Sequence, residues 1–317
     1  MEVFEVVQPG LLTTVQDKGR YGYQQYGVPV SGAMDSYALM VANLLVGNSE
    51  GDACLEITVL GPRLRILGDT LIAITGADLS PALNNNPLPM WEAVKVCYGD
   101  TISFGYPKRG CRSYLAVAGG IDVPEVMGSR STYIKSRLGG LEGRSLRPGD
   151  RLRSGATRVE FSARKLPSQY IFEYTAENEL RVILGPQDDY FTERGIQTFL
   201  HSEYRISVQA DRMGYRLEGP PIEHKAEADI VSDGVPPGAV QVPGDGLPII
   251  LLADRQTTGG YVKIATVSTI DLTKLAQAKP GDRVRFLRVT EEESYQLLIE
   301  YDRIIDALKQ HIQYNDK

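Results

Sequence analysis

Histidine is scarce in this 317-residue chain, which has three: His201, His224 and His311. They lie far apart and form neither an HExxH motif nor a His/Cys cluster with zinc-ligand spacing. We therefore expect no metal site, and a Ser-His-Asp triad would require distant segments to converge. The GxxxxGK[ST], GxGxxG and GxSxG motifs are missing too, so a nucleotide site would have to be built in another way or supplied by a partner.

Cysteine is equally scarce, with Cys54, Cys97 and Cys111 widely spaced. An odd number at such spacing argues against a disulfide framework, and buried inert thiols are expected. The first residues lack the basic and apolar regions of a signal peptide. No run reaches the roughly 20 apolar residues of a membrane span, so the sequence predicts a cytoplasmic protein.

Positive charge is not in excess, because 34 Lys and Arg residues stand against 40 Asp and Glu residues, a net charge of −6. A mildly acidic chain without a long basic run is a poor candidate for binding nucleic acid or an anionic membrane. The length predicts about two domains, large enough to bury their own cores without a metal or disulfide.

Short β-branched runs bounded by Gly, Pro, Asp or Asn are plentiful, and they predict strands. The clearest are residues 70–75, 101–104, 113–117, 180–184 and 248–252. Few helical patterns separate them, which favours barrels or sandwiches over βαβ units. The fold is predicted to be mainly β with a few helices.

A Gly-Asp turn that opens an alternating strand occurs three times, in YGDTISF (98–104), PGDRLR (148–153) and PGDRVRF (280–286). The glycine supplies positive φ and the alternation places apolar side chains on one face. Generic hairpin chemistry would explain each copy. Its appearance late in each half of the chain also suggests two duplicated β units.

The domain boundary is predicted between residues 153 and 179, where the sequence is polar and has no sustained period. The expected parts are residues 1–165, residues 166–290 and a C-terminal helix over 291–317. This helix begins with a capping box of Thr290 and Glu293 and carries an apolar seam at three- and four-residue steps. We expect the seam to pack on its own domain, with a partner interface as the alternative. A second helix is predicted over 34–45, capped by Ser31 or Asp35.

Three segments concentrate polar groups outside the predicted core. In residues 16–35, Asp17, Arg20 and Ser31 are set among Gly and Pro, and the helix start after Ser31-Gly32 offers amides to an anion. Alternatively Asp17 and Arg20 pair with each other and Ser31 is a cap. In the second segment, Arg212 and Arg216 could clamp an anion or lie on a solvated strand face.

The third segment is the most informative. Gly and Pro make up 8 of the 18 residues from 231 to 248, a loop of fixed shape that contains Gln241 and Asp245. The next strand ends in a dense polar cluster, ADRQTTGGYVK (253–263). In this cluster Arg255 and Lys263 could offset developing negative charge, and Asp254 could orient Arg255 or accept a proton.

These motifs resemble the biotin-dependent carboxyltransferase family, whose members include the C subunit of 5-oxoprolinase, the KipI antagonist KipA and allophanate hydrolase subunit 2. The resemblance spans about residues 3–290 and is carried by QDKGRYG (16–22), GVPVSGAMD (27–35), ANLLVGN (42–48), ADRQTTGGY (253–261) and KIATV (263–267).

The resemblance implies two cyclophilin-like β-barrel subdomains and a KipI-like B subunit of 5-oxoprolinase as partner. Three functions follow from it. The first is opening of 5-oxoproline to glutamate with ATP and Mg²⁺ in a complex with the A and B subunits of that enzyme. The second is carboxyl transfer from carboxybiotin to urea or a similar amide, the one case that needs biotin. The third is a non-catalytic KipA-like role that antagonises a KipI-like kinase inhibitor.

The first function is our prediction, with a small cyclic amide as substrate. An activated lactam carbonyl develops oxyanion charge, which Arg20, Arg255 or Lys263 would stabilise while Asp17 or Asp254 handles a proton. The remaining polar and glycine positions are expected to bind the substrate; they are Ser31, Gly32, Gln241, Asp245, Gln256, Thr257, Thr258, Gly259, Gly260 and Tyr261.

Overall fold

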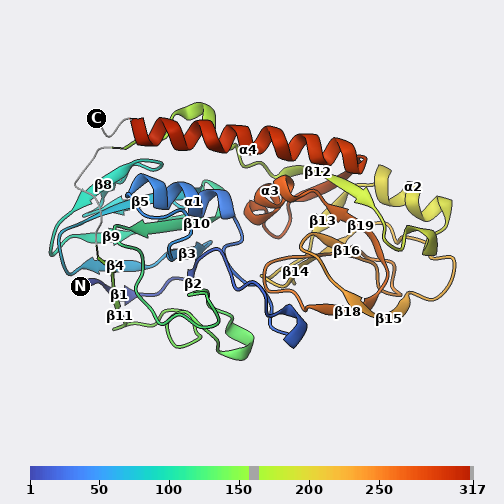
Figure 1. Cartoon of the computed structure of the whole chain (residues 1–317), viewed down its shortest axis with the longest axis horizontal. Helices are drawn as coiled ribbons and strands as arrows, with labels where there is room; N and C mark the ends of the chain where they lie inside the picture. Colours follow the sequence, from blue (N-terminus) through green and yellow to red (C-terminus); the bar gives the residue numbers. More distant parts are fainter. Residues whose placement is uncertain (157–163, 315–317) are drawn as a thin grey trace. The chain divides into compact units, whose positions relative to one another are not determined.

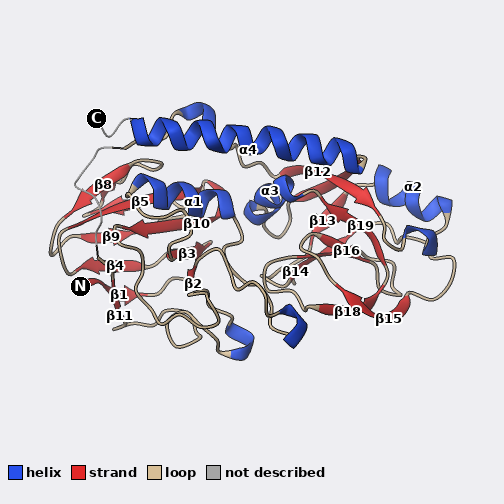
Figure 2. Cartoon of the chain, in the orientation of Figure 1, coloured by secondary structure: helices blue, strands red, loops and turns tan. Residues whose placement is uncertain are grey.

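The computed structural model describes residues 1–156 and 164–314 and divides the chain into two compact units (Figure 1). Unit 1 consists of Met1–Tyr21, Ser31–Tyr174 and Ile305–Lys317, and unit 2 of Gly22–Val30 and Thr175–Ile304. Strands contain more of the described residues than helices do in both units (Figure 2), so the prediction of a mainly β fold is confirmed.

Unit 1 contains two sheets that share one core. The first has the spatial order β11 (Arg151–Arg153), β1 (Glu2–Gln8), β4 (Arg63–Ile66), β9 (Thr101–Ser103), β6 (Ala82–Leu83) and β7 (Asn86–Pro87). The second has the order β2 (Leu12–Gln16), β3 (Cys54–Thr58), β10 (Arg109–Val117), β5 (Thr70–Asp78) and β8 (Ala93–Val96). Both sheets contribute apolar side chains to a single buried cluster, for example Phe4 and Leu64 from the first and Leu55 and Leu115 from the second.

Helix α1 (Ser36–Leu45) packs on β5 and β10 of unit 1. Asp35 is its N-cap, and the Asp35 carboxylate accepts a hydrogen bond from the Ala38 amide at 2.9 Å. Of the two predicted caps, the structure therefore uses Asp35, and the helix begins two residues later than expected.

Unit 2 is built on a closed barrel. Its order is β12 (Glu177–Leu184), β19 (Lys263–Val267), β16 (Ala239–Gln241), β17 (Ile249–Leu251), β14 (Gly214–Glu218), β13 (Tyr204–Ile206) and β20 (Arg283–Arg288). β12 and β20 run parallel, and the other pairs in the barrel are antiparallel. A separate two-stranded sheet pairs β15 (Asp229–Gly234) with β18 (Thr258–Tyr261).

Two short helices of unit 2 were missed by the sequence analysis, α2 (Glu193–His201) and α3 (Leu272–Gln277). Helix α2 packs on β20, where the rings of Phe199 and Phe286 stack at 4.2 Å. Gly195 lowers the helix propensity of α2, but a Cβ at this position would lie 2.3 Å from the carbonyl oxygen of Glu223. The close approach of the Glu223 backbone therefore requires glycine at position 195. The same glycine makes the helix difficult to predict from the sequence.

The predicted C-terminal helix is confirmed as α4 (Glu291–Tyr314). Its capping box forms as expected, because Thr290 N donates to Glu293 Oε2 at 2.8 Å and Glu293 N donates to Thr290 Oγ1 at 3.1 Å. In the part counted with unit 1, Ile305, Leu308 and Ile312 are buried.

The three Gly-Asp turns form by one mechanism. Each glycine has a positive φ and open space around a Cβ, so the backbone conformation and not crowding requires glycine there. In each turn the aspartate accepts a hydrogen bond from the amide three residues earlier, at Asp100, Asp150 and Asp282. The turns lead into β9, β11 and β20, which confirms these predicted strands.

The cysteines follow the sequence prediction at two of three positions. Cys54 and Cys111 are buried, and burial raises the pKa of the Cys54 thiol well above its usual value. Cys97 is exposed, so the prediction was wrong there. It lies just past β8, in the Gly-Asp turn, where its amide is bound by Asp100 and its side chain leaves the core.

Candidate functional site

A cavity of about 400 Å³ in unit 2 brings together the third polar segment and part of the first. Its lining residues are Gln24, Pro29, Val30, Gly234, Val235, Pro236, Pro237, Arg255, Gln256 and Thr257. The three from the first segment lie in Gly22–Val30, the piece of N-terminal chain that belongs to unit 2. Sequence reasoning missed these three, although the Gly- and Pro-rich composition of residues 19–32 had marked the segment as irregular.

Arg255 joins the two loops that form this cavity. Its guanidinium is almost completely buried and donates to the carbonyl oxygens of Val235, at 2.8 Å, and Leu252, at 3.2 Å. The Val235 amide in turn donates to the Thr257 carbonyl oxygen at 3.0 Å. Arg255 therefore fixes the cavity wall and also places a positive charge there.

The amides of Gln241 and Gln256 form a second link at the cavity. Gln256 Nε2 lies 3.4 Å from Gln241 Oε1, and Gln241 Nε2 donates to the Tyr261 carbonyl oxygen at 3.3 Å. Gln241 is buried, whereas Gln256 is exposed. A Cβ at Gly259 would lie 2.6 Å from Gln241 Nε2, so the glycine makes room for this buried amide.

Lys263 is buried with 1% of its side chain exposed, and its Nζ lies 3.0 Å from Asp233 Oδ2. This hydrogen bond, together with one from the Gly234 amide, holds the pKa of Asp233 below its usual value. The lysine charge is thus bound to a carboxylate next to Gly234, which lines the cavity.

Asp254 is paired with Arg212, so the second polar segment meets the third. Arg212 donates from Nε to Asp254 Oδ2 at 2.9 Å and from Nη2 to Asp254 Oδ1 at 3.1 Å, and both side chains are buried. Arg216 is exposed on β14. Of the two arginines, Arg212 thus clamps a carboxylate of the chain itself.

The remaining predicted residues of the third segment lie around this site. Thr258, Gly259, Gly260 and Tyr261 form β18, where Thr258 pairs with Gly234 and Tyr261 with Asp229. Asp245 is exposed and its Oδ1 accepts a hydrogen bond from the Leu247 amide at 3.0 Å, which fixes a turn. No described contact places Asp245 at the cavity.

Asp17 and Arg20 belong to unit 1 and are buried there. Asp17 Oδ1 accepts from Ser129 Oγ at 2.7 Å and from Ser131 Oγ at 2.5 Å, and Asp17 Oδ2 accepts from the Arg130 amide at 2.5 Å. Arg20 donates to the carbonyl oxygens of Val126 and Ser131, both at 2.9 Å. Both side chains anchor the segment from 126 to 131.

Ser31 and Gly32 also lie in unit 1, next to the start of α1. Ser31 has φ 55°, and no described residue accepts or donates a hydrogen bond at its buried hydroxyl. Gly32 has φ 84°, and a Cβ there would be 2.9 Å from the Gly19 Cα.

The anion site predicted at this helix start does not form in the way expected. The Met34 amide already donates to Glu56 Oε2 at 2.8 Å, and the Ala38 amide donates to Asp35. The chain's own carboxylates therefore occupy two of the amides that the sequence offered to an anion.

Burial and the neighbouring Glu56 and Asp35 raise the pKa of Tyr114, which donates to Glu56 at 2.7 Å.

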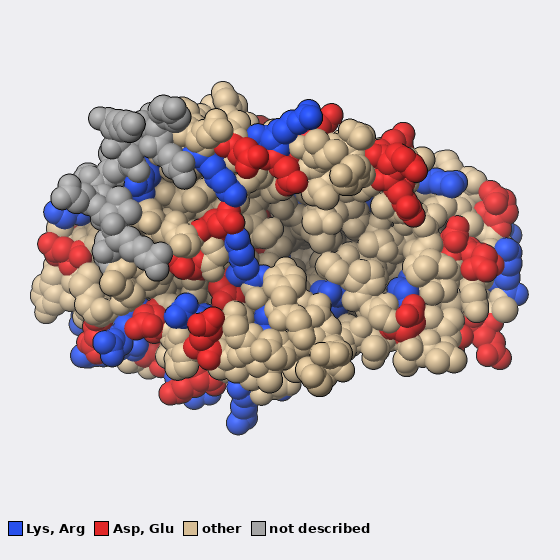
Figure 3. Space-filling view, viewed as in Figure 1, with Lys and Arg blue, Asp and Glu red and all other residues tan. Residues whose placement is uncertain are grey.

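Charge on the viewed face of the molecule is mixed, with Lys and Arg side chains interspersed among Asp and Glu (Figure 3). Within residues 1–156 and 164–314, no group of three or more His, Cys, Asp and Glu side chains is arranged to hold a metal ion. None of the helices described is long and apolar enough to cross a membrane.

A nucleotide triphosphate does not fit the residues of the unit 2 cavity. Arg255 bonds to backbone carbonyl oxygens and Lys263 to Asp233, so the cations near the cavity are engaged by the chain itself. This cavity is therefore not assigned to ATP.

Comparison with known proteins gives consistent results. The protein-family model for the carboxyltransferase domain, subdomain A and B, matches residues 26–288. The C subunit of 5-oxoprolinase from Escherichia coli is 38% identical over 96% of this chain and 97% of its own length. The urea amidolyase of Saccharomyces cerevisiae is 35% identical over 96% of this chain, which corresponds to 18% of the yeast protein.

Solved structures extend the similarity to the fold. The crystal structure of the K. lactis urea amidolyase matches 96% of this chain with a TM-score of 0.91 and 34% identity, over 20% of the larger protein. The resemblance predicted from the sequence motifs is thereby confirmed, and the chain belongs to the carboxyltransferase-domain family, subdomains A and B.

Proposed function

We propose that this chain acts as the C subunit of an ATP-dependent 5-oxoprolinase, which opens a cyclic amide to an amino acid. The observation that carries the proposal is the similarity to the C subunit of the E. coli enzyme over almost the whole length of both chains. A second relative of that name, from Haemophilus influenzae, is 33% identical over 94% of its own length.

The unit 2 cavity is the proposed substrate site. About 400 Å³ is ample for a five-membered lactam with one carboxylate. Gln24, Gln256 and Thr257 present side chains and backbone that can hydrogen-bond the amide and fix its orientation. Arg255 contributes a positive potential at the wall, where the carbonyl oxygen gains negative charge as the amide is attacked.

Other predicted residues act through position in this proposal. Asp254 holds Arg212, and Lys263 holds Asp233, beside the loops that carry the cavity. Proton transfer by Asp17 or Asp254 stays a prediction, as do direct substrate contacts by Ser31, Gly32 and Asp245.

Partner proteins complete the enzyme in this proposal. The lack of a phosphate-binding loop in the sequence and the engaged cations of the cavity both favour a nucleotide site supplied by another protein of the complex. A KipI-like B subunit and the A subunit of 5-oxoprolinase are the proposed partners, and the chain alone is expected to be inactive.

A pair of neighbouring glutamines provides the test. Gln24 and Gln25 are both exposed in the same short helical turn, but of the two only Gln24 lines the cavity. In the complex reconstituted with the A and B subunits, Gln24→Ala and Gln256→Ala should raise the KM for 5-oxoproline on the order of tenfold, whereas Gln25→Ala should leave it unchanged. Equal KM values for all three variants and the wild type would contradict the assignment of the cavity.

Variants that remove a positive charge near the cavity test whether these charges support catalysis. Arg255→Ala and Lys263→Ala, each with the circular dichroism spectrum of the wild type, should lower 5-oxoproline-dependent ATP hydrolysis in the same complex. Full activity in both would overturn their assignment. Tight binding of the KipI-like partner without turnover of 5-oxoproline or urea would instead support the KipA-like role.

Carboxyl transfer is the second candidate, favoured by the family model and by the match to urea amidolyase. Biotin is carried on a lysine side chain, and the Ala33-Met34-Asp35 segment has none. Biotin would then arrive on a partner. Urea-dependent turnover with a biotin carboxylase partner, and none with 5-oxoproline, would decide for this candidate.

A further inference from the structure

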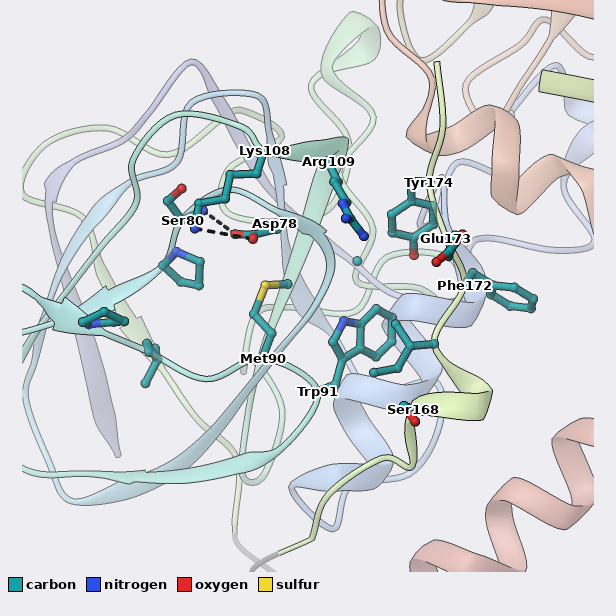
Figure 4. Close-up of a pocket in the computed structure, with 15 residues that line it drawn as sticks. Asp78, Ser80, Met90, Trp91, Lys108, Arg109, Ser168, Phe172, Glu173 and Tyr174 are labelled. Carbon is teal, nitrogen blue, oxygen red and sulfur yellow. Dashed lines mark hydrogen bonds and ion pairs between the residues drawn. The ribbon is translucent and has the colours of Figure 1, made fainter. Parts of the chain in front are cut away.

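A second and larger cavity lies within unit 1, and it shares no lining residue with the proposed substrate site. Its volume is about 660 Å³, within the range of small-molecule sites. Leu88, Met90, Trp91 and Ile171 supply much of its apolar surface, while Arg109 and Glu173 supply charge (Figure 4).

Trp91 is held in place by a strained backbone. Its φ of 60° lies in the left-handed region, which is rare for a bulky residue and persists only where the surroundings impose it. The Trp91 amide donates to the Ile74 carbonyl oxygen and its own carbonyl oxygen accepts from the Leu166 amide, both at 2.8 Å. These two bonds fix the backbone of Trp91, a lining residue of the cavity.

The facing wall is formed by residues 168–174, which are anchored on α1. Tyr37 donates from its hydroxyl to the Tyr170 carbonyl oxygen at 2.5 Å, and its ring meets Phe172 edge-on at 4.6 Å. Tyr174 donates to Asp35 Oδ2 at 3.2 Å. The cavity is therefore bounded by two walls that are each tied to the core of unit 1.

Two of the charged residues at the cavity, Arg109 and Glu173, remain available to a ligand. Two others, Lys108 and Asp78, form an ion pair with 3.7 Å between Nζ and Oδ2. The Arg109 guanidinium and the Glu173 carboxylate, both exposed, make no hydrogen bond or ion pair with any residue that the structure describes. Figure 4 shows Arg109 extending from β10 toward Tyr174, on the same side of the cavity as Glu173.

We propose that this cavity binds a planar heterocycle that carries an N–H donor and an anionic group. The ring packs against the Trp91 indole, because stacked aromatic faces gain energy beyond the area that they bury. Arg109 binds the anion, whose carboxylate or phosphate oxygens match the planar guanidinium. Glu173, an acceptor when ionised, receives the N–H donor.

The test uses Trp91 as its own reporter, because it is the one tryptophan of the chain. Adenosine 5′-monophosphate and orotate share the proposed chemistry, one with a phosphate and one with a carboxylate. Titration of the full chain with either should change the tryptophan emission saturably. Adenosine, which lacks the anion, should bind at least about tenfold more weakly than its monophosphate, and ribose 5-phosphate, which lacks the ring, should give no change.

Variants separate the site from general quenching. Arg109→Gln should weaken binding of the responding anion by about tenfold and leave adenosine unaffected. A response to orotate alone assigns the anion as a carboxylate, and one to the nucleotide alone assigns a phosphate. No response to either ligand, or undiminished binding to Arg109→Gln, overturns the proposal. Because the readout is binding to the chain alone, failure of the hydrolysis assays has no bearing on it.

Discussion

Replacing Asp254 by Asn removes a buried charge and leaves its partner, Arg212, buried. Both side chains are less than 10% exposed, and two hydrogen bonds of 2.9 and 3.1 Å join them. The asparagine amide can accept one of these bonds, but its NH₂ group then faces an arginine donor. Breaking a buried ion pair by removing one partner costs about 3–5 kcal/mol, and we expect Asp254→Asn to destabilise unit 2 by this amount.

Urea unfolding followed by far-ultraviolet circular dichroism measures the loss. A double-mutant cycle with Arg212→Met and Asp254→Leu isolates the pair, since the apolar double variant leaves no orphaned charge. We expect a coupling energy of about 2–3 kcal/mol. The exposed pair Arg65–Glu5, 3.2 Å apart, is the matched control, and Glu5→Gln should cost less than about 1 kcal/mol.

Two results would refute the reasoning. If Asp254→Asn and Glu5→Gln cost the same, solvent reaches the Arg212–Asp254 pair and its burial does not set the energy. If the two single variants add without coupling, the bonds do not act as a pair.

Further predictions concern the helix cap, the acid response and the glycine turns. Thr290→Ala removes half of the capping box and should cost about 1 kcal/mol, seen as faster hydrogen exchange in the first turn of α4. Burial alone would raise the pKa of Asp271, but hydrogen bonds from Arg181 outweigh it and lower the pKa below the usual 3.8. The resulting stability is complete above that usual value and is lost as pH falls through the lower folded-state pKa. The gap in melting temperature between wild type and Asp271→Asn should therefore narrow as pH falls below about 4, and a constant gap would contradict the shift. Gly143→Ala should lower the free energy of unfolding in urea by about 1–3 kcal/mol more than Gly149→Ala does. Both glycines have a positive φ, but only at Gly143 would a Cβ meet backbone, at 2.0 Å. Equal losses for the two variants would show that the backbone relaxes around the new Cβ.

Local chemistry made much of the fold predictable from the sequence. The Gly-Asp turns, the capping box at Thr290 and the short β-branched runs depend on residues within a few positions of one another, and each formed as expected. Gly195 shows the limit of such rules. Glycine is required there by the carbonyl oxygen of Glu223, which is distant in the sequence but close in space.

The candidate site was predictable only in part. Its residue types and the loops that present them could be read from the sequence, and Arg255, Gln256 and Thr257 do meet at one cavity. The partners could not be read, because they lie far along the chain: Arg212 is 42 residues from Asp254, and Lys263 is 30 residues from Asp233. Without those partners, an engaged arginine and an available one look the same in a sequence.

The division of the chain between the two units has a consequence for synthesis on the ribosome. Gly22–Val30 emerges early, but its place is in unit 2, whose cavity loops around residues 234–257 emerge more than two hundred residues later. Unit 1 in turn receives its last segment, from Ile305 onward, after all of unit 2 has been made. Neither unit can reach its final form before the other is nearly complete, so translation should yield both together, late, and exposed partial forms of each should be substrates for chaperones until then.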